Sequence, residues 1–323
     1  MVTPIRVLSI KQKNIQAGEN TRMGVGGIIA MKIKEGASYR IFSLFNIIFM
    51  LLLTFVTIYP VLHVLFASFS NGNELLAHSG ILLWPIKFNV SAYYNVFRDP
   101  MIINGYLNTL FILLVGVSIN VLFTCLGAYF FSREKVMWKT PIFLIVLFTM
   151  FFSGGVIPFY LTVQELGMDD SIWALIVPSA VNTFNLIILR TGFRSVPVSL
   201  EESARLDGAG HLRIMFKIVL PLCMPIIAVI LLYYAVEKWN SWFHAMMFIK
   251  TRSKSPLQLV LRGILLSNDN TAMTTGTSVA DQEGVGEAVK YAVIVVATAP
   301  ILVLYPFLQK YFVKGVLVGA VKG

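Results

Sequence analysis

Long apolar runs dominate the chain, and short polar segments separate them. A helix of about 20 apolar residues crosses a bilayer, so each run of that length predicts a membrane span. Six runs qualify, at residues 41–69, 106–131, 141–163, 172–189, 222–248 and 292–309. The pattern therefore predicts an all-α integral membrane protein with six transmembrane helices.

Composition supports a membrane protein. Hydrophobic residues make up 57% of the chain and charged residues 13%, whereas soluble domains contain about 25% charged residues. The formal charge of +10 does not indicate nucleic-acid binding, because the basic residues lie beside the apolar runs, where the positive-inside rule expects them.

The distribution of Lys and Arg predicts the orientation. With the N-terminus inside, cytoplasmic segments hold seven in residues 1–40, three in 132–140, five in 190–220 and three in 310–323. The external segments hold two in 70–105, none in 164–171 and five in 249–290. This bias predicts that both termini are cytoplasmic.

The polar segments define the domain organisation. Residues 1–35 are polar and weakly periodic, which predicts a flexible cytoplasmic tail, and residues 36–323 form the six-span domain. The external segment 249–290 has about forty residues, more than a connector needs. Its first half is amphipathic and its second half is polar, so we expect it to form a docking surface for an external partner.

The chain lacks the residue patterns of an enzyme or a metal site. Cys125 and Cys223 lie in apolar runs, which favours buried apolar thiols over a disulfide. The four histidines have no metal-ligand spacing, and no GxxxxGK[ST] motif occurs. We therefore expect no catalytic residue, no metal ligand and no nucleotide site in this chain.

A charged segment, residues 196–221, interrupts the apolar pattern on the cytoplasmic side. Pro197 prevents the preceding helix from continuing, and Ser199 with Glu202 fits a capping box. A short helix over about residues 200–207 follows, and Gly208 is suited to the left-handed conformation that ends helices. A second helix runs from near His211 to Pro221. The segment is predicted to form a helix–bend–helix elbow.

The spacing E-S-A-x3-G-x9-I-x-L-P within this elbow resembles the EAA loop of binding-protein-dependent ABC importers. The family motif reads E-A-A-x3-G-x9-I-x-L-P, and this chain departs from it only by Ser for the middle Ala. The matching residues are Glu202, Ser203, Ala204, Gly208, Ile218, Leu220 and Pro221. The stretches RLDGA, WNSW, PLQL and YFVKGVLVGAVKG further resemble the carbohydrate branch, most closely the second permease subunit of maltose-type and complex-oligosaccharide importers.

This resemblance implies a type I ABC importer permease in the cytoplasmic membrane of a bacterium. Its partners would be a second homologous permease, two copies of a cytoplasmic ABC ATPase that binds ATP and Mg, an external solute-binding protein and an oligosaccharide. The residues implied in ATPase coupling are the seven motif positions together with Asp207 of RLDGA. Glu202 has two competing uses, as a helix cap and as a contact with the ATPase.

The stretch EKWNSWFH, toward the outer end of the fifth predicted span, provides candidates for the substrate path. Aromatic faces cover the apolar side of a pyranose, and an amide bonds to its hydroxyls. The candidates here are Trp239, Asn240, Trp242 and Phe243. The alternative is an aromatic belt at the outer interface with a snorkelling lysine.

Two asparagines in the fourth predicted span, Asn182 and Asn185, are further candidates for the path. They are three residues apart and are able to share a helix face. The alternative for them is a hydrogen bond between helices.

Alternatives to sugar import remain at the sequence level. A permease for amino acids, peptides or phosphate would share the loop motif. An ion-coupled secondary transporter would need intramembrane acids and internal repeats, and the mid-span regions carry almost no acids. Basic residues of the external segment (Lys250, Arg252, Lys254 and Arg262) suit an acidic oligosaccharide or an acidic surface on the binding protein.

Overall fold

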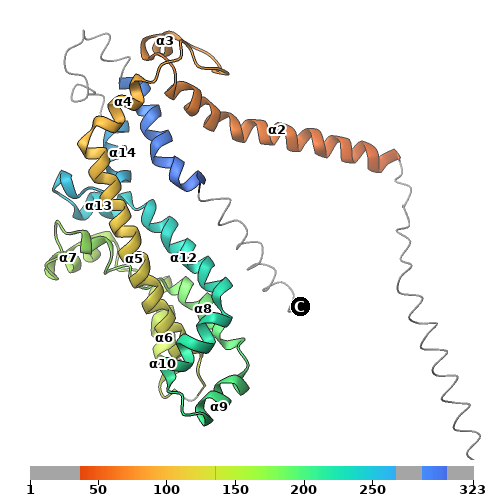
Figure 1. The fold of residues 1–323 in the computed structure, drawn as a ribbon, viewed down its shortest axis with the longest axis vertical. Helices are drawn as coiled ribbons and strands as arrows, with labels where there is room; N and C mark the ends of the chain where they lie inside the picture. Colours follow the sequence, from red (N-terminus) through yellow and green to blue (C-terminus); the bar gives the residue numbers. More distant parts are fainter. Residues whose placement is uncertain (1–36, 135, 267–285, 304–323) are drawn as a thin grey trace, which may run out of the picture. The chain divides into compact units, whose positions relative to one another are not determined.

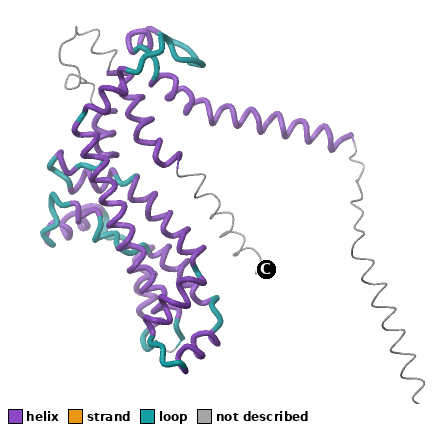
Figure 2. The backbone as a smooth tube through the Cα atoms, viewed as in Figure 1, coloured by secondary structure: helices purple, strands orange, loops and turns teal. Residues whose placement is uncertain are grey.

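The computed structural model describes residues 37–134, 136–266 and 286–303. Within these ranges the regular elements are helices, and none of the residues forms a strand (Figures 1 and 2). The chain divides into two compact units, Met1–Tyr59 and Pro60–Gly323. This helical architecture agrees with the predicted fold class.

The described part of the first unit belongs to helix α2, Ala37–Ser68, which continues into the second unit. Its sequence is apolar on every side, as a span requires. The hydroxyls of Thr54 and Thr57 donate to the carbonyls of Met50 and Leu53, at 2.7 and 2.9 Å. The two threonine hydroxyls therefore have hydrogen-bond partners within the helix. The first predicted span is confirmed as a helix.

Helix α5, Pro100–Ser132, organises the second unit. Asp99 begins it by accepting a hydrogen bond from Met101 N at 2.8 Å, and Pro100 occupies the first turn, where no N–H is needed. Buried residues of α5 contribute to each of three apolar clusters, for example Val117, Ile102 and Ile112. The second predicted span is thus a continuous helix at the centre of the core.

The most extensive helix packing on α5 comes from α8 (Thr183–Arg194), α12 (Met224–Trp239) and α14 (Leu257–Leu266). Gly105 of α5 allows a close approach, because a Cβ there would lie 3.1 Å from the Cα of Leu257. The hydroxyl of Thr109 also accepts a hydrogen bond from Leu257 N at 2.9 Å. The amphipathic half of the external segment is therefore a helix fixed to the core.

Two predicted spans are bent where the sequence weakens the helix. Helices α6 (Lys139–Phe151) and α7 (Val156–Glu165) meet at 119° across a break that contains Gly155, with φ of 87°. The fifth predicted span is α12, which stops at Trp239, followed by the short helix α13, Trp242–Phe248. Apolarity alone did not reveal these interruptions.

The fourth predicted span, 172–189, is wrong as a continuous helix. A 3-10 turn, η1 (Ile172–Leu175), is followed by residues 176–182 without helix, and α8 begins only at Thr183. Pro178 has no N–H to donate, and Asn182 caps the new helix by accepting from Phe184 N at 2.9 Å. Both residues oppose a helix through this region.

Three described helices are long and apolar enough to cross a membrane, or up to five if each bent pair is one span. The bent pairs are α6 with α7, and the segments His211–Leu222 and Met224–Trp239. The last long helix is Gly286–Val303, and the end of the sixth predicted span lies outside the described residues. The count of six spans stays a prediction.

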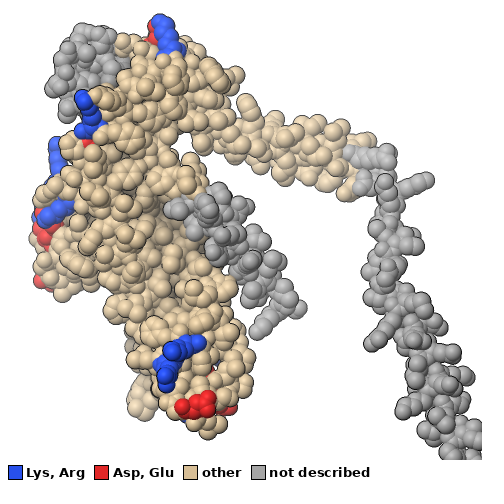
Figure 3. Space-filling model, viewed as in Figure 1, with Lys and Arg blue, Asp and Glu red and all other residues tan. Residues whose placement is uncertain are grey.

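Charged side chains on the visible face of the second unit gather in separate places (Figure 3). They appear beside α3 (Gly72–Ala77) and α4 (Ser91–Arg98), near α13, and at the opposite end near α9 (Val198–Leu206), with an uncharged surface along α5 between them. An uncharged band between charged ends is the surface that a bilayer requires.

The carboxylate of Asp170 joins the loop after α7 to the loop after α13. Asp170 has φ of 49° and accepts hydrogen bonds from Lys250 N and Thr251 N, each at 2.9 Å, and from Thr251 Oγ1 at 2.6 Å. Lys254 Nζ adds an ion pair at 2.9 Å. The Thr251 hydroxyl, its backbone N–H and the other donors hold the pKa of Asp170 well below its usual range.

We expect Asp170→Asn to lower the thermal stability of the purified protein at neutral pH, because the depressed pKa shows that the folded state favours the carboxylate. This stabilisation is complete above the unfolded pKa of about 4 and is lost as the pH falls through the folded value. The difference in Tm between wild type and variant should therefore narrow below about pH 4.

Glu74→Gln, which removes the exposed ion pair between Lys87 and Glu74, is the matched control and should change Tm little. Intrinsic fluorescence during heating measures both variants. An Asp170→Asn protein as stable as wild type at neutral pH would contradict the role of this carboxylate.

Candidate functional site

The cytoplasmic segment forms the predicted elbow. Helix α9, Val198–Leu206, ends before Gly208, whose φ of 79° is left-handed, and helix α10 begins at His211. The predicted capping box is wrong. Pro197 is the N-cap residue and makes no side-chain cap bond, so Ser199 lies inside the first turn and not before it.

The second helix of the elbow is irregular. After α10 (His211–Ile214) it widens into a π-helix, Met215–Val219, and continues as Leu220–Leu222. Pro221 has no N–H for the Lys217 carbonyl, which is a local reason for the widened turn. The helix ends one residue after the expected position, and an 87° bend at Cys223 leads into α12.

The motif residues fall into an exposed group and a packed group. Glu202, Ser203, Asp207, Gly208 and Pro221 are exposed, whereas Ala204, Ile218 and Leu220 are half-buried against the core. Leu206, at the end of α9, has 90% of its surface exposed. A short helix thus presents acidic, small and apolar side chains together on its outer face.

A buried ion pair fixes the inner face of α9 to the core. Glu201 is 4% exposed and pairs with Arg133, the residue that follows α5. The guanidinium of Arg133 also donates to the Phe193 carbonyl of α8 at 3.1 Å and lies 4.8 Å from the ring centroid of Tyr129. One side chain therefore joins α5, α8 and α9.

Sequence reasoning assigned a role to Glu202 and overlooked Glu201. Adjacent residues of a helix point in different directions, so a Glu–Glu pair at a helix start has one member able to turn inward. That signal was present in the sequence. The partner was not identifiable, because Arg133 belongs to a different helix end.

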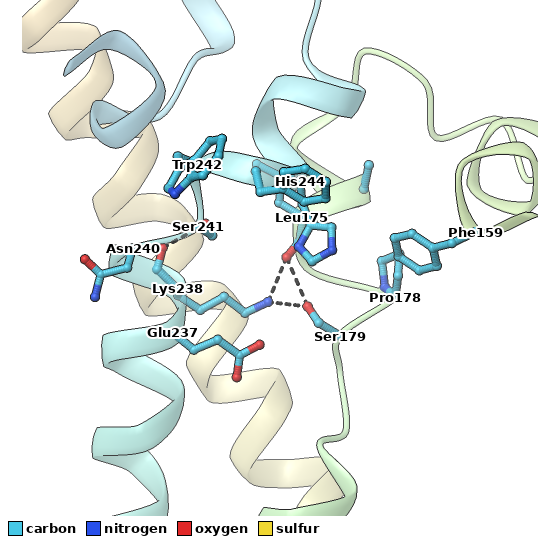
Figure 4. Close-up of a pocket in the computed structure, with 12 residues that line it drawn as sticks. Phe159, Leu175, Pro178, Ser179, Glu237, Lys238, Asn240, Ser241, Trp242 and His244 are labelled. Carbon is cyan, nitrogen blue, oxygen red and sulfur yellow. Dashed lines mark hydrogen bonds between the residues drawn. The ribbon is translucent and has the colours of Figure 1, made fainter. Parts of the chain in front are cut away.

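A second site is a cavity of about 230 Å³ at the upper end of α12 (Figure 4). It lies between the end of α12, α13, Phe159 of α7, and the stretch that interrupts the fourth predicted span. Its lining combines aromatic, hydroxyl and ionisable groups. These include Phe159, Ser179, Glu237, Lys238, Asn240, Ser241, Trp242, Phe243 and His244.

The structure brings part of the predicted substrate path together. Asn240, Trp242 and Phe243 line the cavity, although the Asn240 amide donates back to Val236 O at 2.9 Å and points away from Lys238 in Figure 4. Trp239 is instead buried in the core, 6.4 Å from the ring of Tyr106. Trp239, a candidate for the substrate path, therefore does not line this cavity.

The two asparagines of the fourth predicted span do not line this cavity. Asn182 is the N-cap of α8, and its own N–H donates to Tyr234 Oη at 2.9 Å. Asn185 is buried in the first turn of that helix. Both residues lie at the start of α8, which exists only because the fourth predicted span is interrupted. The prediction of a continuous helix did not anticipate this location.

Lys238 does not snorkel to the surface, as the aromatic-belt alternative required. It is 3% exposed, and its ammonium donates to Leu175 O at 2.7 Å and to Ser179 Oγ (Figure 4). The neighbouring Glu237 lines the same cavity and forms no ion pair with it.

Comparisons with known proteins agree with this architecture. Residues 23–318 match the family model of the binding-protein-dependent transport system inner membrane component. The polygalacturonan/rhamnogalacturonan transport system permease protein YtcP of Bacillus subtilis is 42% identical over 88% of this chain and 99% of its own length. The maltodextrin transport system permease protein MdxG of the same organism is 29% identical over 85% of this chain and 95% of its own length.

Among solved structures, a chain of a bacterial ABC transporter that imports the acidic polysaccharide alginate is similar, with a TM-score of 0.79 and 33% identity. The similarity covers 86% of this chain and 98% of that one. Full-length relatives of this kind are transport components and not enzymes. The chain thus belongs to the family of binding-protein-dependent transport system inner membrane components, as a permease subunit of a sugar ABC importer.

Proposed function

We propose that the outer face of α9 is the surface through which an ATPase drives this permease. The proposal rests on the different surroundings of two adjacent glutamates. Glu201 is tied inward to Arg133, whereas Glu202 and Ser203 beside it are exposed. Small and acidic groups on a short helix suit close packing and charge-assisted hydrogen bonds with a partner.

The full coupling set consists of residues on the exposed face and residues that brace it. Glu202, Ser203, Asp207 and Gly208 form the contact and the bend, while Ala204, Ile218 and Leu220 hold the elbow on the core. Pro221 is exposed and lies where the second helix of the elbow ends. A movement of the ATPase that displaces α9 is transmitted to α5 and α8 through Arg133. Rotation of these helices against a partner subunit opens the path by alternating access.

The assembly that this function requires contains a second homologous permease, two copies of a cytoplasmic ABC ATPase and an external solute-binding protein. ATP and Mg bind to the ATPase, and this chain needs no cofactor. The family description supports dependence on a binding protein. The bias of Lys and Arg supports six spans with both termini in the bacterial cytoplasm.

The cargo that fits best is an oligosaccharide, and more specifically an acidic one. Two similar proteins are described by polygalacturonan/rhamnogalacturonan transport and by import of the acidic polysaccharide alginate. In this chain, Asn240, Trp242 and Phe243 line a cavity with the aromatic and amide groups that sugars require. The other predicted candidates for the path, Trp239, Asn182 and Asn185, do not line this cavity.

The external segment 249–290 is the proposed docking surface for the binding protein. Its helix α14 is anchored by Leu257, Val260 and Leu261, which are buried. The turn Arg252–Lys254 that precedes this helix is held by the Asn108 amide, which donates to Ser253 O at 2.8 Å. Residues 267–285 lie outside the described residues, so the projecting half of the segment is an expectation from sequence length.

Glu202→Lys should lower uptake by about tenfold or more, since losing a charge-assisted contact costs roughly 1.5–3 kcal/mol. Gly208→Pro should also lower uptake, because proline cannot adopt the φ of 79° that forms the bend. Both variants should remain in the membrane, because neither residue is buried. Uptake by the complete complex in proteoliposomes measures the effect. Ser199→Ala is the matched control on the same helix and should behave as wild type, since Ser199 caps nothing.

If Glu202→Lys and Gly208→Pro both kept normal uptake and normal substrate-stimulated ATP hydrolysis, the proposal that α9 couples this permease to the ATPase would be wrong.

Arg133→Gln leaves Glu201 buried without its cation, and removing one partner of a buried pair costs about 3–5 kcal/mol. We expect a lower Tm for the purified complex and a lower ratio of stimulated to basal ATP hydrolysis. Arg194→Gln is the control, because Arg194 is an exposed cation at the end of α8. If both arginine variants kept wild-type stability and wild-type stimulation of ATP hydrolysis, the ion pair between Arg133 and Glu201 would not transmit movement from α9 to the core.

Replacing residues 268–285 with a short Gly-Ser linker should reduce stimulation of ATP hydrolysis by the binding protein while basal hydrolysis persists. The reason is that α14 remains anchored to α5, so only the projecting part is lost. Titration of the binding protein against ATP hydrolysis checks this outcome. Unchanged stimulation and unchanged uptake would show that docking occurs elsewhere.

A further inference from the structure

The cavity beside α12 contains a cation in an unusual environment. Between Leu175 and Thr183 the chain has no helix, so its carbonyls need donors from elsewhere. Lys238 reaches across from α12 and donates to Leu175 O and Ser179 Oγ (Figure 4). A broken helix whose free backbone lines a cavity is the arrangement in which membrane transporters hold substrates.

The partners of this ammonium are neutral. Lys238 is 3% exposed, and among the described residues no carboxylate lies within 4.0 Å of its Nζ. An ammonium has three N–H donors, of which a carbonyl and a hydroxyl occupy two. A buried charge is costly unless it is paired. The Glu237 carboxylate of the same cavity lies beyond 4.0 Å, so the third N–H of Lys238 is able to donate to an anion in the cavity.

The position of the ammonium is fixed by its surroundings. The aliphatic stem lies against α5 at Gly116, where a Cβ would be 3.5 Å from Lys238 Cε. The head is held by the end of η1. Because both ends of the side chain are restrained, little conformational entropy is lost when an anion arrives.

The rest of the cavity suits a sugar ring that carries the anion. Phe159, Trp242 and Phe243 offer aromatic faces to the C–H side of a pyranose. Glu237 lines the same cavity and is an acceptor for sugar hydroxyls, and His244 is the other titratable lining group. A uronate presents both a carboxylate for the cation and hydroxyls for the carboxylate of Glu237.

We propose that Lys238 binds the carboxylate of a uronate unit as an acidic oligosaccharide passes through this cavity. The juxtaposition of a buried ammonium that has neutral partners with aromatic walls carries the assignment. It rests on the proposed function of sugar import and identifies the residue that distinguishes acidic from neutral cargo at this point of the path.

Uptake of two matched probes by the complete complex tests the proposal. The probes are a short galacturonide and its methyl ester, which differ in charge but not in sugar. Each variant is compared with wild type on each probe, so the preference of the binding protein cancels. Lys238→Gln should reduce uptake of the acid about tenfold while uptake of the ester stays within about twofold. Lys238→Arg should keep most of the acid uptake.

Equal loss of both probes in Lys238→Gln would mean that the ammonium only caps the broken helix, and unchanged uptake of the acid would mean that no carboxylate binds there. Either result overturns the proposal. Glu237→Gln is the second variant, in case Lys238→Gln fails to assemble. Removing this negative charge should raise the ratio of acid to ester uptake, and an unchanged or lower ratio contradicts the assignment.

A wild-type complex that imports neither probe nor any neutral oligosaccharide would contradict the proposed function and this inference with it. A complex that imports neutral oligosaccharides and the ester but not the acid would contradict the inference and the acidic character of the proposed cargo, and would leave the proposed import of oligosaccharides intact.

Discussion

The buried ion pair between Arg133 and Glu201 is the constraint on which the cytoplasmic half of the structure depends. The guanidinium binds Glu201 of α9, the Phe193 carbonyl of α8 and the end of its own helix α5. Without it, α9 would be a short helix held by few apolar contacts, and helices of this length are marginal in isolation. The pair makes a surface element part of the core, so a force on its exposed face reaches α5.

The interruptions of the apolar helices serve the other end of the path. Continuous helices would satisfy their own carbonyls and leave no polar lining. The break at residues 176–182 leaves the Leu175 carbonyl at the end of η1, where it accepts from Lys238 and from Ser179 Oγ. The stop at Trp239 places Trp242 and Phe243 in the wall of the same cavity. In a membrane, non-helical backbone is tolerated where it is buried in protein or lines a cavity.

The sequence predicted the helical class, the elbow with its left-handed Gly208, and the grouping of Asn240, Trp242 and Phe243. Each rests on local information: apolar length, glycine conformation and residue type. It did not predict the pairing of Arg133 with Glu201 or the contact of Lys238 with Leu175 O, because these join distant segments. The break before α8 was also missed, since hydropathy does not distinguish an apolar loop from an apolar helix.

Site-specific cross-linking from α9 tests the central claim most directly. The native Cys125 and Cys223 are both buried, so Ser203→Cys places an exposed thiol on the outer face of α9. In the assembled complex, it should cross-link to the ATPase, with a yield that changes when ATP binds. Arg98→Cys, on α4 near the opposite end, should not. Absence of a cross-link from Ser203→Cys in an assembled, transport-active complex would contradict the account.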